Sequence, residues 1–212
     1  MTVMLPGVPP GRAGRNWLRR RQAIALRGRE QLDRKLRILF PDRQRLALQA
    51  DRHRADWEAS CAEARTWLLR AALLGGQDGI RTASPPEEVG VEVHWTTSMG
   101  LRYPADATLF EPWSGGGQVE QQRTNAGIAP AAAAFRAAAV SGARLAAAEE
   151  AVRRMDAEIA VTRRRLRALE KRWLPRIEGS LAVLELSLEQ AELEEGMRLR
   201  QAAGGVGGRW GR

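Results

Sequence analysis

The sequence predicts an all-α protein, a long antiparallel two-helix coiled coil with a small β-hairpin and an irregular segment in its middle. Three observations lead to this prediction. The composition is 44% hydrophobic, much of it alanine, with 28% charged and only 5% aromatic residues, which is typical of long helices. Apolar residues recur with heptad spacing in the first and last thirds of the chain. Most glycines and prolines lie between these thirds.

This distribution of turn-forming residues divides the 212 residues into five segments. We expect an N-terminal extension over residues 1–11 and a first long helix over 12–74. Residues 75–130 form the irregular middle segment. A second long helix is expected over 131–203, and a glycine-rich flexible tail over 204–212.

Two prolines lie inside the predicted helices. Proline lacks an amide hydrogen, and its ring clashes with the carbonyl group four residues earlier. Pro41 therefore predicts a kink or a short break in the first helix, and Pro175 predicts a bend near the carbonyl of Lys171 in the second. A bend would make the helix pair asymmetric. The alternative is a tolerated kink without functional meaning.

The seam of the coiled coil follows from the spacing of apolar side chains at steps of three and four. In the second helix the predicted seam residues are Leu145, Val152, Met155, Ile159, Leu166, Leu169 and Trp173, and in the first they are Trp17, Ile24, Leu32, Trp57 and Leu68. A helix with one narrow apolar stripe buries that stripe against a partner helix. We therefore expect the two helices to seal each other's seam as an antiparallel pair.

The middle segment contains a predicted β-hairpin over about residues 91–104. Alternating, β-branched residues around Val93 predict the first strand. Met99 and Gly100 follow in a turn, and a short second strand leads to Pro104. A two-stranded hairpin is only marginally stable alone, so it should pack against other elements.

The sequence offers little support for enzymatic chemistry. It has no phosphate-binding loop and no nucleophile elbow. The two histidines, His53 and His94, and the single cysteine, Cys61, do not complete a four-ligand zinc site. We therefore expect no catalytic residues, no cofactor and no metal. With no apolar run of 18 residues, we also expect a soluble protein.

The chain is strongly basic, with 34 Lys and Arg residues against 25 Asp and Glu and a net charge of +9. Such an excess favours an anionic partner, which could be nucleic acid, a membrane surface or an acidic protein. One cluster contains Arg12, Arg15 and residues 19–21, and a second contains residues 163–165. A solvated helix face is the alternative interpretation of each cluster.

Several segments match one known family in order, from about residue 10 to residue 200. The segment at 162–170, TRRRLRALE, and the segment at 173–177, WLPRI, resemble T-R-R-R-V-N-A-L-E and I-P-R-L of the D subunit of the archaeal/vacuolar-type (V/A-type) rotary ATPases. The Met99-Gly100 turn before Pro104 resembles the hairpin signature M-G-V-x-x-P, and residues 197–200, MRLR, resemble F-R-L-K. Residues 10–12, PGR, resemble the family's PTR-like start, with Gly11 in place of the threonine, and Arg167 replaces the asparagine of T-R-R-R-V-N-A-L-E.

The resemblance implies a central-stalk rotor shaft that performs no chemistry itself. It couples ATP hydrolysis or synthesis in a catalytic hexamer to proton or sodium transport across the membrane. The implied partners are the catalytic and regulatory subunits of the hexamer, the small F subunit of the stalk, and a funnel-shaped subunit that connects to the membrane ring. The implied location is the cytoplasmic face of the membrane, as a soluble peripheral part of the complex, with no direct nucleotide binding.

Arginines are the candidate contacts with the hexamer, because guanidinium groups pair with carboxylates bidentately. The candidates are Arg12, Arg15, Arg19, Arg163, Arg164, Arg165, Arg198 and Arg200. Two alternatives remain open at this point: a coiled-coil scaffold without a rotary role, and a basic, helical nucleic-acid-binding protein. Salt-sensitive binding to unrelated DNA would favour the latter.

Overall fold

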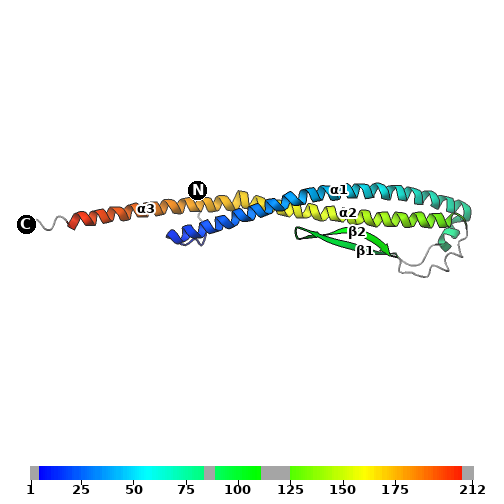
Figure 1. Cartoon of the computed structure of the whole chain (residues 1–212), viewed down its shortest axis with the longest axis horizontal. Helices are drawn as coiled ribbons and strands as arrows, with labels where there is room; N and C mark the ends of the chain where they lie inside the picture. Colours follow the sequence, from blue (N-terminus) through cyan, green and yellow to red (C-terminus); the bar gives the residue numbers. More distant parts are fainter. Residues whose placement is uncertain (1–4, 84–88, 111–124, 207–212) are drawn as a thin grey trace, which may run out of the picture. The chain divides into compact units, whose positions relative to one another are not determined.

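The computed structural model describes residues 5–83, 89–110 and 125–206. Its elements, in order, are helix α1 (Gly11–Ala83), strands β1 (Gly90–Ser98) and β2 (Leu101–Phe110), helix α2 (Ile128–Ala168), the π-helical turn η2 (Leu169–Trp173) and helix α3 (Leu174–Val206) (Figure 1). Two long helical segments with a two-stranded hairpin between them in the sequence confirm the predicted fold class. The glycine run at 115–117 and tail residues 207–212 lie outside the described residues.

Helix α1 consists of two helices joined across a kink at Gly76, whose dihedral angles are non-helical, at φ 66° and ψ −177°. The kink lies two residues after Leu74, where the first long helix was expected to end, and the second, short helix continues to Ala83. The chain stays helical through Pro41, so the structure does not contain the break expected there. Pro41 is exposed. Solvent can therefore take the hydrogen bond that the carbonyl of Arg37 loses to the missing amide hydrogen.

The chain divides into two compact units, each built on antiparallel helices. The first comprises Met1–Leu36 with Val161–Arg212, and the second is Arg37–Ala160. In each unit, ion pairs join residues progressively later in α1 to residues progressively earlier in the other helical segment. In the first unit these pairs are Arg12–Glu192 at 3.0 Å and Arg19–Glu185 at 2.8 Å; in the second they are Arg43–Asp156 at 2.9 Å and Arg54–Glu149 at 2.8 Å.

The core of the first unit lies between the N-terminal part of α1 and α3. Leu18, Ile177 and Leu184 are buried and form its centre, and Leu5 packs against them. The backbone N–H of Leu5 donates to the buried Oγ of Ser180 at 3.0 Å, and this hydroxyl in turn donates to the carbonyl of Arg176. The residues before α1 are thus fixed to α3, and both polar groups of the contact are satisfied.

The apolar seam of α1 lies one residue beyond the expected one at its N-terminal end. The side chain of Ile24 is 67% exposed and does not belong to the seam. The buried or half-buried positions recur every seven residues as Leu18, Ala25, Leu32, Leu39 and Leu46. A strict seven-residue repeat keeps one face of a helix against its partner. Trp17, beside this seam, is half-buried and packs at the edge of the Leu18 cluster.

The seam of the second helical segment changes position at η2. Leu145, Met155 and Ile159 are buried, and Val152, Leu166 and Leu169 are half-buried. Trp173, the next expected position, is 45% exposed, whereas Leu174 is buried. The N–H of Leu174 donates to the carbonyl of Leu169, which is the spacing of a π-helix and inserts one residue into the turn. This extra residue moves the seam from Trp173 to Leu174.

The π-helical turn lies directly before Pro175. Pro175 has no N–H to donate to the carbonyl of Lys171 and its ring crowds that carbonyl, which disfavours a regular α-helical turn here. A wider turn accommodates the ring. The sequence predicted a disturbance at Lys171, and that residue lies inside η2. Whether the axis bends there stays a prediction.

Small side chains form two clusters between α1 and α2 in the second unit. Ala64 packs with Ala134 and Ala138, and Ala71 packs with Ile128 and Ala131. A Cβ atom on Gly127 would lie 2.9 Å from the Cα of Ala71, so the backbone at the start of α2 approaches α1 closely. Such small residues allow α1 and α2 to pack with little space between their backbones.

Two larger seam residues of α1 lie beside this alanine core. Trp57, expected in the seam, is 39% exposed, and a Cβ atom on Gly142 of α2 would lie 3.1 Å from its indole nitrogen. Its ring therefore lies at the margin of the interface. Leu68 is half-buried.

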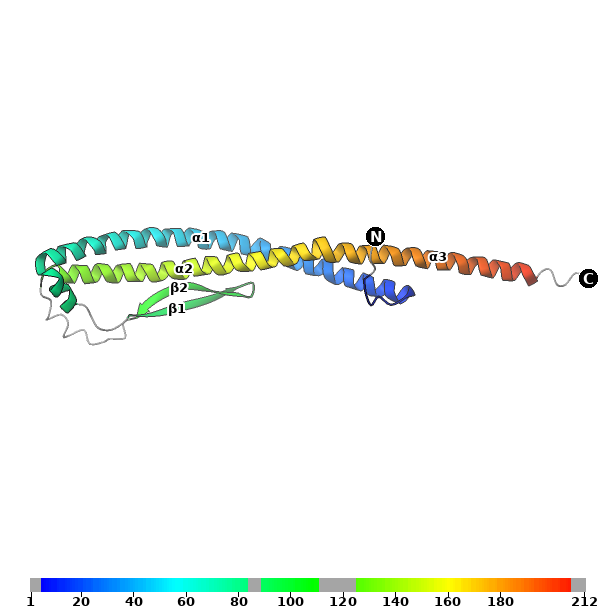
Figure 2. The same ribbon diagram turned by 180° about the vertical axis from the view of Figure 1, so that it is seen from behind.

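The hairpin is longer than expected and lies beside α2 in both views (Figures 1 and 2). Met99 and Gly100, with φ 49° and 79°, form its two-residue turn, as the sequence predicted. Positive φ angles at both positions match the right-handed twist of the strands. A register shift lies between His94 and Trp95. Near the turn, Val93 is 38% exposed, while Pro104 is buried.

Candidate interaction surface

The first unit has a markedly uneven charge along its helices. Residues 15–35 and 163–176 contain fifteen basic side chains and three acidic ones, whereas residues 177–197 contain six acidic side chains and no basic one. We call these fifteen basic residues the basic surface. All of them are exposed except Arg15 and Lys35, which are half-buried. The second unit has fourteen basic and sixteen acidic residues in its sequence, so the net positive charge of the chain comes from the first unit.

The paired helices determine which of these side chains point outward. Leu18 and Ile177 are buried between α1 and α3, so neighbouring positions on the other sides of each helix face solvent. Arg19 is nevertheless paired across the helices with Glu185 at 2.8 Å, and Arg29 with Glu170 at 3.9 Å. Exposed pairs of this kind contribute little to stability, roughly 0–1 kcal/mol. They can therefore exchange for contacts with another protein at small cost.

Seven of the eight candidate arginines fall into three groups in the structure. Arg164 and Arg165 are exposed on α2, next to Arg163, which already has an interaction within the chain. Arg12 and Arg19 cross to Glu192 and Glu185 on α3.

The third group lies near the end of α3. Arg198 is 3.7 Å from Glu194, and Arg200 donates to the carbonyl of Gly196 at 3.2 Å. The structure therefore does not bring all eight candidates into one cluster. Arg15 differs from the others, because its Nε atom is buried without a hydrogen-bond partner.

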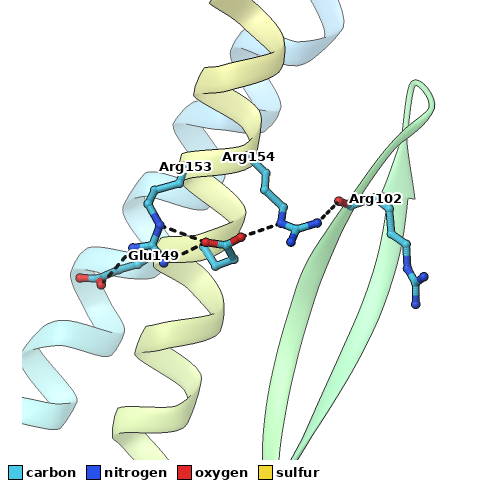
Figure 3. A network of polar contacts seen from close by, with 5 residues as sticks. Arg102, Glu149, Arg153 and Arg154 are labelled. Carbon is cyan, nitrogen blue, oxygen red and sulfur yellow. Dashed lines mark hydrogen bonds and ion pairs between the residues drawn. The ribbon is translucent and has the colours of Figure 1, made fainter.

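A second polar network joins α2 to the hairpin (Figure 3). Arg154 of α2 donates to Glu150 at 2.7 Å and to the backbone carbonyl of Arg102 in β2 at 3.4 Å. Arg153 donates to the same carboxylate at 3.0 Å. These two hydrogen bonds lower the pKa of Glu150, since they stabilise its ionised form.

This pKa shift predicts acid sensitivity of the second unit. A pKa below the ordinary 4.5 in the folded chain means that ionised Glu150 stabilises the fold above that pH. The stabilisation is lost as the pH falls through the lowered pKa. We expect Glu150→Gln to unfold at a lower urea concentration than the wild type at neutral pH, and we expect this difference to shrink as the pH falls below 4.5. A difference that is constant with pH would contradict the ionic contribution.

Contacts between distant residues also position the hairpin, and no pattern in the sequence indicated them. Ser98 Oγ at the hairpin tip donates to Asp42 Oδ2 of α1 at 2.9 Å, and Arg144 of α2 lies 3.9 Å from Asp106 of β2. Ser98 and Asp42 are 56 positions apart in sequence. The one available signal was the general expectation that a hairpin needs a packing partner.

Two other features would indicate a different kind of site: a group of metal-ligating side chains and a membrane-spanning helix. The described residues do not bring three or more His, Cys, Asp or Glu side chains together in a group that could hold a metal ion. Within the same part of the chain, no helix has the length and apolar character needed to cross a membrane. The basic surface is the candidate site for partner proteins because exposed guanidinium groups can pair with carboxylates.

Comparison with known proteins agrees with this architecture. The family model for the ATP synthase D subunit matches residues 16–204. The chain is 30% identical over 202 residues to the D subunit of the A-type ATP synthase of Methanopyrus kandleri, covering 93% of this chain and 86% of the relative. It is 26% identical over 196 residues to the D subunit of the V-type ATP synthase of Thermotoga neapolitana, covering 92% and 96%. The chain therefore belongs to the family of D subunits, which form part of the central stalk of the V/A-type rotary ATP synthases.

Proposed function

We propose that the chain is the rotor shaft of its ATP synthase, a non-catalytic component that couples ATP hydrolysis or synthesis to proton or sodium transport. Its partners are the catalytic and regulatory subunits of a hexamer, the small F subunit of the stalk, and a funnel-shaped subunit that connects to the membrane ring. It works at the cytoplasmic face of the membrane, as a soluble peripheral part of the complex. Membership of the family of D subunits supports each of these roles.

The basic surface is the observation that most directly supports the rotor role. Coupling requires that each angular position of the rotor bind the surrounding subunits with a different affinity. Exposed arginines on one stretch of a helix pair meet this need, because guanidinium groups pair with carboxylates in a defined, bidentate geometry. A ring of acidic side chains inside the hexamer is the partner that such a surface fits.

Reconstitution of the complex with and without this chain tests the proposal. We expect the complex assembled without the chain to show no ATP-driven ion transport, because nothing connects the hexamer to the membrane ring. Adding the purified chain should restore transport. A tagged chain that is recovered from native membranes without hexamer subunits, or transport that persists in its absence, would rule out the rotor role.

A further inference from the structure

We propose that the hairpin is a detachable strap, held against α1 and α2 by a polar latch at its tip. The latch consists of Asp42 and Arg154 on the helices, with Ser98 and the carbonyl of Arg102 as their partners on the hairpin. In this view the hairpin leaves the helices while α1 and α2 stay folded and paired. The inference concerns the second unit alone and does not depend on the rotor role.

Both latch residues on the helices have a polar contact within their own helix, independent of the hairpin. Glu150, one turn before Arg154 on α2, accepts a hydrogen bond of 2.7 Å from the Arg154 guanidinium. Asp42 is likewise joined to Arg45 on its own helix at 3.2 Å. Each latch group is therefore oriented by a neighbour on the same helix; Figure 3 shows this for Arg154.

Arg154 contacts the hairpin in two ways. Its guanidinium donates to the carbonyl of Arg102 at 3.4 Å and lies 4.9 Å from the centre of the Trp95 ring. The guanidinium of Arg102 lies 4.8 Å from the same ring. Trp95 is 42% exposed, so these cation–π contacts are close to solvent, where they are weak. These contacts orient the hairpin tip against α2 and leave the Trp95 side chain partly exposed.

Behind the tip, the hairpin does not pack continuously on the helices. A partly open pocket of about 300 Å³ lies at this place, and its lining includes Pro104 and Ala105 of β2, Leu46 of α1 and Ala148 of α2. It lies at the register shift, where Ala105 has no paired residue on β1. Tyr103 and Ala107, on either side, are buried side chains of the hairpin. The strap is thus attached at separate points.

The helix pair has its own core without the hairpin. The two alanine-rich clusters of the second unit contain residues of α1 and α2 and none from the strands. Detachment of the hairpin leaves these contacts in place. A free two-stranded hairpin is marginally stable in water. Detachment should therefore appear as faster hydrogen exchange of the strand amides, with little change in the helices.

Hydrogen exchange of the full chain, followed by mass spectrometry, tests the strap. In Arg154→Gln we expect exchange in residues 90–110 to rise about tenfold, the effect of losing one charge-assisted hydrogen bond. Peptides from α1 and α2 should keep their protection. Asp42→Ala should act similarly from the other side of the tip, and Arg154→Lys should restore part of the protection. Arg153→Gln is the matched control, since Arg153 binds the same Glu150 carboxylate.

A reversible cross-link distinguishes detachment from local fraying of the strands. In a Cys61→Ser background, Asp42→Cys with Ser98→Cys joins the tip to α1 where the two side chains are now 2.9 Å apart. Oxidation should suppress the exchange caused by Arg154→Gln, and reduction should restore it. Exchange that stays high when cross-linked overturns the proposal. So does unchanged exchange in both latch variants, or a parallel rise in the helices.

Discussion

Changing Arg164 and Arg165 to glutamate is expected to reduce ATP-driven ion transport by at least about tenfold while ATP hydrolysis continues, because like charges placed opposite each other cost several kcal/mol. Both side chains are exposed on α2 within the basic surface. Arg163 is kept, because it already interacts within the chain. Transport into sealed vesicles and ATP hydrolysis should be measured on the same reconstituted complex, so that their ratio reports coupling.

The matched control makes the same charge change outside the basic surface. Arg52 and Arg65 are exposed on α1 in the second unit, and their replacement by glutamate should leave the ratio of transport to hydrolysis close to the wild-type value. An equal loss in both variants would mean that net charge, rather than position, matters. An unchanged ratio in the Arg164 and Arg165 variant would exclude these arginines as coupling contacts.

Replacing Ile177 by alanine is expected to lower the free energy of unfolding by about 3 kcal/mol, the usual cost of a cavity in a packed core. Ile177 is 1% exposed and lies between Leu18 and Leu184. Trp173→Ala removes a larger side chain that is 45% exposed, and it should cost about 1 kcal/mol or less. Urea unfolding of the full chain, monitored by circular dichroism, measures both. If Trp173→Ala proved the more destabilising change, the seam would run through Trp173 and not through Leu174.

The fold class was predictable because the heptad spacing of apolar residues repeats along both long helical segments. Assigning a few individual residues to the wrong face does not change that pattern. Its exact face was harder to find. Near the start of α1, Trp17 and Leu18 are both apolar neighbours, as are Ile24 and Ala25, so two adjacent stripes fit the sequence. The larger residues favoured the wrong stripe. Which stripe is buried depends on how the partner helix lies against α1. The small side chain of Ala25 lets the two helices approach more closely than Ile24 would.

The candidate site was predictable in composition but not in its internal contacts. Clusters of arginine are visible in the sequence, yet the pairing of Arg12 with Glu192 joins residues 180 positions apart. The contact of Arg154 with the hairpin could likewise not be predicted without the position of the hairpin against α2. Pro175 predicted an irregularity in the helix. That this irregularity is a π-helical turn depends on how the neighbouring seam residues stay buried.

The extra residue in η2 divides the second helical segment into two phases. Counting in sevens from Leu145 predicts buried or half-buried positions correctly up to Leu166, and the same count is one residue early from Leu174 onward. A single heptad frame carried through η2 would therefore assign Trp173 to the seam in place of Leu174. Deleting one residue from η2 would bring the two frames together while leaving the buried face of α3 in place, because the wide turn already absorbs that residue.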